Sequence, residues 1–199
     1  MLMLALRSSF AVLPLVLVSC GLGYLYQGPP FRLGYRGWGE PICWLAFGPF
    51  ATAAALLVLA PSDQAAVPWG LALMLGSGPA LATSLVLFCS HFHQVEEDAA
   101  HGKCSPVVRL GTAKAASLVP WFVAGTLALE WVPVVHGDWP LTALFGASGL
   151  PAAAALIRLL RDHHAAPDRS AGSKFLALRF QTLNGLGLSA GLALGPLLS

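Results

Sequence analysis

The chain has 199 residues, of which 56% are hydrophobic and 10% are charged, whereas an ordinary soluble domain carries about 25% charged residues. A soluble domain of this size cannot bury so much apolar surface, so the composition excludes a soluble fold and indicates a membrane protein. The formal net charge is only +2, and Lys and Arg are spread along the chain without forming a basic stripe, which argues against nucleic acid as a partner.

Six stretches of the chain are long and apolar enough to be transmembrane helices, which need about 20 residues each. They run over 10–26, 41–60, 67–90, 116–135, 140–160 and 175–198. The start of the chain, 1–20, is also similar to a lipoprotein signal, because Arg7 precedes an apolar stretch and Leu-Val-Ser-Cys follows at 17–20. A lipoprotein would continue into a soluble domain, whereas five more apolar stretches follow here. The predicted fold is therefore all-α, a polytopic transmembrane bundle of about six helices.

The positive charges alternate between successive loops. Basic residues occur in the loops 27–40, 91–115 and 161–174, and the two loops between them contain none. This alternation follows the positive-inside rule. The three basic loops are therefore predicted to lie together on the cytoplasmic side of the membrane.

Two features of the apolar stretches are predicted to be structural. Gly187, Gly191 and Gly195 repeat every four residues, which puts a bare face on the last helix where another helix can approach closely. Glu130 lies near a predicted helix end beside Trp131, and a charge at the bilayer centre is costly. An interfacial, structural position is therefore expected for Glu130.

The loop 91–115 contains the polar groups that are best suited to chemistry. Three of the nine acidic residues are consecutive there, as Glu96, Glu97 and Asp98. If the preceding helix continues through this loop, Gln94, Glu97 and Asp98 share one face, because they are three or four residues apart. Such carboxylates can hold Mg²⁺, which proteins usually bind through one or two carboxylates together with substrate phosphates.

Cations follow the acidic residues in the same loop. Lys103 and Arg109, with the hydroxyl of Ser105, can neutralise and bind the oxygens of a diphosphate. His91 and His93 are expected to line the mouth of such a site. Two alternatives remain at this point. The loop is merely solvated, or it binds zinc through Cys89, His91, His93, His101 and Cys104, although these residues have none of the usual paired ligand spacings.

The stretch HQVEEDAAHGKCSPVVRLGT at 93–112 resembles the second acidic motif of the UbiA-superfamily intramembrane prenyltransferases. Two further stretches resemble the cyanobacterial and chloroplast branch of that family, the 1,4-dihydroxy-2-naphthoate phytyltransferases. They are GYLYQGPPFRLGYRGWGEPICWLAFGP at 23–49 and SKFLALRFQTLNG at 173–185. The similarity spans about 23–191, and its three motifs occur in the expected order on one predicted side of the membrane.

The resemblance implies a specific reaction. Mg²⁺ held by Glu96, Glu97 and Asp98 would grip a prenyl diphosphate, and the allylic cation would be attacked by dihydroxynaphthoate in phylloquinone or menaquinone biosynthesis. Gln94 stands where many members of the family have Asp. The remaining roles implied by the resemblance are diphosphate binding by Lys103, Arg109 and Ser105, and lining of the site by Arg32, Tyr35, Arg36, His91, His93 and Arg179. The membrane would be a plasma membrane or a thylakoid membrane.

The sequence departs from the family in one major respect. Members of the family have about nine helices and a first acidic motif of the Asn-Asp-x-x-Asp kind, which this sequence lacks. The chain is therefore expected to be a single transmembrane prenyltransferase domain over 1–199, matching the C-terminal two-thirds of the fold. Three explanations of the missing part stay open: the sequence is a fragment of a full enzyme, it is a degenerate remnant, or another polypeptide supplies the missing helices. The alternatives are a non-enzymatic membrane subunit or transporter half, and a prenyltransferase that uses another aromatic acceptor, such as homogentisate or a chlorophyllide.

Overall fold

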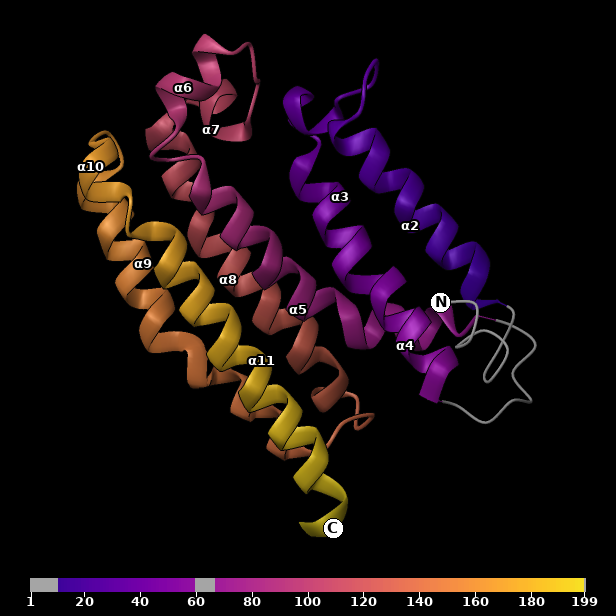
Figure 1. Ribbon diagram of the computed structural model, residues 1–199. Coiled ribbons are helices and arrows are strands. Elements are labelled where there is room, and N and C mark those ends of the chain that lie inside the picture. Colours follow the sequence, from indigo (N-terminus) through magenta and orange to yellow (C-terminus); the bar gives the residue numbers. More distant parts are fainter. Residues whose placement is uncertain (1–10, 60–66, 199) are drawn as a thin grey trace.

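The computed structural model describes residues 11–59 and 67–198, and this part of the chain is helical without any strand (Figure 1). Each of the six predicted spans corresponds to one helical stretch. The first predicted span begins at Phe10 and the second ends at Ala60, and both of these residues lie outside the described residues. The stretches are α2 (Val12–Gln27), α3 (Gly39–Leu45) continuing through the π-helix η2 (Ala46–Phe50) into α4 (Ala51–Leu59), α5 (Trp69–Ser90), α8 (Thr112–Val135), the 3-10 helix η3 (Leu141–Gly149) continuing into α9 (Leu150–His163), and α11 (Ser173–Leu198).

Four of these stretches are long and apolar enough to cross a membrane, judged by length and composition. They are Gly39–Leu59, Trp69–Ser90, Thr112–Val135 and Leu141–His163. Helix α2 is apolar but shorter, with 16 residues, and α11 is longer but contains several polar side chains. The chain is a multi-pass membrane protein, as its composition predicts.

The polar connections between the spans gather at one end of the bundle (Figure 1). These are the α2–α3 connection with the 3-10 helix η1 (Leu33–Arg36), the short helices α6 (Val95–Ala100) and α7 (Pro106–Leu110), and the short helix α10 (Pro167–Ser170). The three basic loops therefore lie on the same side of the bundle, as their charge predicts.

The loop 91–115 differs from the expected extension of the preceding helix. Helix α5 ends at Ser90, a turn follows, and α6 begins as a separate helix after Gln94. Helix α7 begins at Pro106, where Ser105 is the N-cap, and Gly111 with a φ of 79° separates α7 from α8. Helix α8 begins directly after Gly111, at Thr112, which is four residues before the predicted start.

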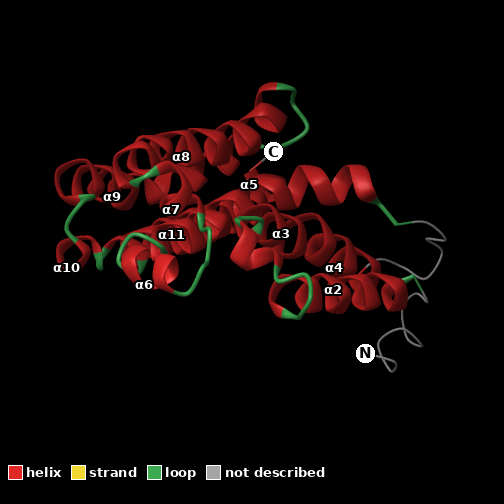
Figure 2. Cartoon of the chain, turned by 90° about the horizontal axis from the view of Figure 1, so that it is seen from above, coloured by secondary structure: helices red, strands yellow, loops and turns green. Residues whose placement is uncertain are grey.

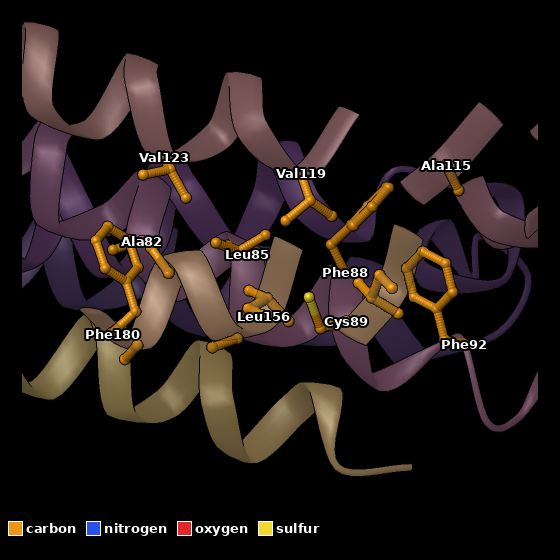
Figure 3. Close-up of a cluster of buried hydrophobic side chains, with 14 of the residues drawn as sticks. Ala82, Leu85, Phe88, Cys89, Phe92, Ala115, Val119, Val123, Leu156 and Phe180 are labelled. Atoms are coloured by element: carbon orange, nitrogen blue, oxygen red, sulfur yellow. The ribbon is translucent and has the colours of Figure 1, made fainter. Parts of the chain in front are cut away.

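A single core holds α5, α8, α9 and α11 together (Figure 3). Leu85 and Phe88 of α5 meet Val119 of α8, Leu156 of α9 and Phe180 of α11 in this core, and all five side chains are buried. Lipid tails are as apolar as these side chains, so close packing rather than removal from water stabilises the association of the helices.

The glycine face of α11 packs against η3. A Cβ atom on Gly187 would collide with the carbonyl oxygen of Phe145, and one on Gly191 with that of Thr142. The hydroxyl of Thr142 donates a hydrogen bond to the carbonyl oxygen of Gly191 at 2.6 Å. The predicted close approach is confirmed, and the partner segment belongs to the same chain.

Glu130 is buried between helices of the bundle, with a structural role as expected from the sequence. Its side chain is 1% exposed, and its Oε2 accepts a hydrogen bond from Nδ2 of Asn184 at 2.8 Å. The same amide nitrogen donates to the carbonyl oxygen of Gly146 at 3.0 Å. Gly78 leaves room for the carboxylate, since a Cβ atom there would lie 2.7 Å from Cγ of Glu130. These hydrogen bonds join α8, α11 and η3.

Candidate active site

Asp98 is the buried member of the acidic run in α6. Its side chain is 7% exposed, whereas Glu96 and Glu97 on the same short helix are exposed. Oδ1 of Asp98 accepts a hydrogen bond from Nζ of Lys103 at 3.1 Å, and Oδ2 lies 3.1 Å from Nδ1 of His91. The loop between them is closed by the amide of Lys103, which donates to the carbonyl oxygen of Asp98 at 2.8 Å. The turn after α5 and the start of α6 therefore position one carboxylate between two nitrogen groups.

Glu40 extends this group toward the first basic loop. It lies in the first turn of α3, is 8% exposed, and places Oε1 at 3.4 Å from Nε2 of His91. The two atoms are close enough for an ion pair, but they do not form a hydrogen bond, and neither carboxylate oxygen of Glu40 has a hydrogen-bond partner among the described residues. His91 thus lies between two buried carboxylates.

A polar cavity of about 320 Å³ opens beside Asp98. Its walls come from the end of α2, the first basic loop and the α6 region. The lining residues are Tyr26, Gln27, Gly34, Tyr35, Gln94, Glu97, Asp98, His101 and Lys103. The cavity therefore brings together Gln94, Glu97, Asp98 and Lys103 from the predicted site, with Tyr35 from the first loop, whereas Glu96 does not line it.

A second hollow of about 630 Å³ is lined by three guanidinium groups, those of Arg32, Arg36 and Arg109. Tyr35 and His101 line both this hollow and the polar cavity, so the two adjoin. Among the described residues, none of these three arginines has a carboxylate within ion-pair distance. The hollow is therefore a cationic site without a protein counter-ion, next to a cavity that carries carboxylates.

The first and third loops are joined by backbone contacts. The amide of Cys104 donates to the carbonyl oxygen of Tyr35 at 2.7 Å. Gly37, with a φ of 80°, allows this approach, because a Cβ atom there would lie 2.7 Å from the carbonyl oxygen of Cys104. The arginines of the first loop are thus held beside Arg109 of the third loop. The pattern of charges in the sequence does not predict this contact between the loops.

Three other predicted site residues lie elsewhere. Ser105 is fully buried, and its Oγ accepts the amide of Val108 at 3.4 Å as the cap of α7. Arg179 is exposed on α11 and lines neither the polar cavity nor the arginine hollow. His93 is half-buried with Nε2 at 3.4 Å from Nζ of Lys174; burial lowers the pKa of His93, and the charge of Lys174 lowers it further.

An apolar groove of about 890 Å³ runs between α2, α3, α5 and α11. Tyr26 lines both this groove and the polar cavity, so the two spaces adjoin at this side chain. Figure 1 shows α2 and α3 on one side of α5 and α11 on the other side. A ligand with a polar head and a long apolar tail can therefore have its head in the polar cavity and its tail along the groove.

The oxygen donors around the polar cavity suit a divalent cation. Oδ1 of Asp98 already faces the positive charge of Lys103 at 3.1 Å, and Glu97 and Gln94 line the same cavity. Two carboxylates and an amide, completed by phosphate oxygens, are a typical donor set for Mg²⁺. Among the described residues, no three His, Cys, Asp or Glu side chains are close enough to share an ion. A metal here would therefore depend on oxygens from its ligand.

The sequence is similar to known prenyltransferases. The profile of the UbiA prenyltransferase family matches residues 1–183. The chain is 40% identical over 182 residues to the 2-carboxy-1,4-naphthoquinone phytyltransferase of Synechocystis sp., covering 92% of this chain and 58% of that protein. It is 41% identical over 175 residues to the chloroplastic 2-carboxy-1,4-naphthoquinone phytyltransferase of Arabidopsis thaliana, covering 86% of this chain and 46% of that protein.

A more distant relative extends the comparison. The 1,4-dihydroxy-2-naphthoate octaprenyltransferase of Mycobacterium tuberculosis is 30% identical over 147 residues, which cover 73% of this chain and 48% of that protein. The chain thus spans about half the length of the curated relatives that it matches. No solved structure matches it at a significant level.

Proposed function

Because the chain belongs to the UbiA prenyltransferase family, we propose that it takes part in transferring a phytyl group from its diphosphate to 1,4-dihydroxy-2-naphthoate in phylloquinone or menaquinone biosynthesis. The observation that supports this most is the meeting of three spaces, a cavity with carboxylates, a hollow with three arginines, and an apolar groove. The names of the relatives give the acceptor as a carboxylated naphthoquinone or as the corresponding dihydroxynaphthoate, two oxidation states of one ring system.

The metal belongs to the polar cavity in this proposal. UbiA prenyltransferases generally use a divalent metal ion to bind diphosphate. We assign Mg²⁺ to Glu97 and Asp98, with the amide oxygen of Gln94 as a further donor, while Glu96 adds negative charge from the exposed side of α6. Bound there, Mg²⁺ would neutralise charge on the diphosphate and make it a better leaving group.

The protein's own cations bind the diphosphate. Arg32, Arg36 and Arg109 surround the hollow, and planar guanidinium groups form paired hydrogen bonds with phosphate oxygens. Lys103 lies at the wall of the adjoining cavity, where its flexible stem can carry the ammonium group from Asp98 to a phosphate oxygen. Ser105 is left out of this assignment, because its hydroxyl caps α7.

Glu40 and His91 act as positioning residues for Asp98. Both are buried, and the imidazole ring lies between the two carboxylates, so Asp98 cannot turn without breaking the contact with His91. A fixed carboxylate contributes more to binding a developing charge than a mobile one, because it does not have to reorganise.

The proposed reaction replaces one bond at the allylic carbon. The C–O bond to diphosphate breaks and the electron pair leaves with the diphosphate, which the arginines and Lys103 stabilise. The ring carbon that bears the carboxylate then forms the new C–C bond, and CO₂ leaves. The product is the reduced phytyl naphthoquinol, whose oxidation to the quinone is a later step.

The proposed location is a plasma membrane or a thylakoid membrane. The basic loops 27–40, 91–115 and 161–174 would face the cytoplasm, in agreement with the positive-inside rule. Water-soluble Mg²⁺ and the diphosphate head would then reach the site from that side, while the phytyl tail enters from the bilayer.

A transfer assay tests the proposal. The chain is reconstituted in liposomes, alone and fused behind the part of the Synechocystis relative that it does not match, with labelled phytyl diphosphate, dihydroxynaphthoate and Mg²⁺. We expect a lipid-soluble labelled naphthoquinol that requires Mg²⁺, and no product when homogentisate replaces the naphthoate. Failure of both proteins to form product would contradict the proposal, and product from homogentisate alone would reassign the acceptor.

A further inference from the structure

The apolar groove contains one charged side chain. Among the described residues that line it, Lys174 is the only one with a formal charge. Uncharged polar side chains also line it, those of Ser19, Tyr26, Thr83, Ser90 and Gln181. Lys174 lies in the first turn of α11, at the end of the bundle that holds the polar loops (Figure 1). The groove is thus apolar along most of its length and cationic at one place.

Lys174 has no counter-ion in the described part of the chain. No carboxylate lies within ion-pair distance of its ammonium group, and the residue as a whole is half-buried. One N–H donates to Nε2 of His93 at 3.4 Å, and the ammonium nitrogen lies 5.3 Å from the ring centroid of Phe175. Nδ1 of His93 is itself buried and has no hydrogen-bond partner among the described residues. A half-buried charge in apolar surroundings is costly unless an anion pairs with it.

The geometry points to Lys174 as the binding site for the carboxylate of an aromatic acid, with the aromatic rings lying at the end of the apolar groove that Lys174 and Tyr26 line, so that the rest of the groove is left for the prenyl tail. We infer that this acid is the acceptor substrate, an inference that rests on the proposed function. Apolar walls suit fused rings, while one ammonium group matches the single charge of a carboxylate. Tyr26 lines both the groove and the polar cavity, so rings held at this end of the groove would lie next to the proposed diphosphate site.

The alternative ligand for Lys174 is the diphosphate itself. A diphosphate carries several charges, and the hollow of Arg32, Arg36 and Arg109 offers three cations that match it better. Lys174 lines neither that hollow nor the polar cavity. Its position therefore favours a separate, singly charged anion.

Binding of a stable acceptor analogue tests this inference. The probe is 1-hydroxy-2-naphthoate, compared with its uncharged carboxamide, and binding to the purified chain in detergent is followed by the fluorescence of the probe. We expect the wild-type chain to prefer the acid by about tenfold, the size of a charge-assisted hydrogen bond. Lys174→Met should remove that preference, and Lys174→Arg should retain it.

Two controls separate the outcomes. Lys114→Met removes an exposed lysine at the start of α8 and should leave naphthoate binding unchanged. Binding of inorganic diphosphate with Mg²⁺ is measured on the same samples, so a failure of the proposed diphosphate site is seen independently of Lys174. The inference is overturned if the wild-type chain does not prefer the acid, if Lys174→Met retains the preference, or if Lys174→Met weakens diphosphate binding instead.

Discussion

Asp98 is the residue on which the proposed chemistry depends most. It is the one buried carboxylate of the acidic run, and His91 and Lys103 both contact it at 3.1 Å. Glu96 and Glu97 are exposed. A change at Asp98 should therefore affect both the binding of a cation and the order of the neighbouring side chains.

Asp98→Asn keeps the size of the side chain and removes its charge. We expect turnover of the active enzyme to fall by about 100-fold or more, because a fixed charge aimed at the leaving group is lost. Mn²⁺ binding in the presence of inorganic diphosphate, followed by electron paramagnetic resonance, should weaken in parallel. Asp168→Asn is the matched control, since Asp168 is exposed on α10. Unchanged Mn²⁺ binding in Asp98→Asn would remove Asp98 from the metal site.

Arg109→Ala tests the cationic hollow. The loss of one guanidinium group should raise the apparent KM for phytyl diphosphate by about tenfold, the usual size of a lost hydrogen bond to a charged group. Arg169→Ala removes an exposed arginine from α10 and should leave the KM unchanged. An equal KM in wild type and Arg109→Ala would assign Arg109 to the solvated surface.

The sequence predicts the contacts between polar residues that are neighbours in the chain, but not the contacts between residues that are far apart in it. Gln94, Glu97, Asp98 and Lys103 are close in sequence, so their common cavity follows from local spacing. Glu40 is missed because it stands alone, about 50 residues before its partner His91, and only the packing of α3 against α5 brings them together. A lone acid at the polar end of an apolar stretch is the signal that could have found it.

At the scale of elements, the contact between α11 and η3 depends on bare glycine positions. Gly191→Ala should destabilise the protein by about 1–3 kcal/mol, because the new methyl group collides with the carbonyl oxygen of Thr142. Gly185 lies on the same helix with open space around its Cβ position. Gly185→Ala should be neutral or stabilising by about 0.5–1 kcal/mol. Unfolding by sodium dodecyl sulfate measures both, and equal stability of Gly191→Ala and wild type would contradict the packing.

Helix existence is predictable from the sequence, whereas helix type and ends are not. Six apolar stretches predict six helical stretches, because a backbone in lipid must satisfy its own hydrogen bonds. The 3-10 helix η3 is not predicted, since its composition is that of an ordinary span. The separate helices α6 and α7 are likewise hidden in one charged loop, where caps and turns decide the boundaries.

At the scale of the whole molecule, the elements that carry the site lie at one end of the bundle (Figure 1). In the view from above, α6, α7 and α10 lie in the same part of the picture (Figure 2). The chain spans about half of its relatives, so the part that they have in addition can contribute further residues to the same site.

Cysteine labelling tests this one-sided arrangement. Cys104 is exposed in the third loop, and Cys89 is buried. In a background without Cys20 and Cys43, a membrane-impermeant maleimide should not label Cys104 in intact spheroplasts and should label it once the membrane is opened. His136→Cys, in the turn after α8, should show the opposite behaviour when Cys104 is replaced by serine. Labelling of Cys104 in intact spheroplasts would contradict the cytoplasmic placement of the site.

The most direct test of the account is the thermal stability of the purified chain with Mg²⁺ and phytyl diphosphate, each alone and both together. A ligand present at 100 times its Kd stabilises the folded state by about 2.7 kcal/mol. We predict that the two ligands together raise the Tm by several degrees in the wild-type chain and not in Asp98→Asn. An unchanged Tm in the wild-type chain would contradict a metal-dependent diphosphate site and favour a non-enzymatic membrane subunit.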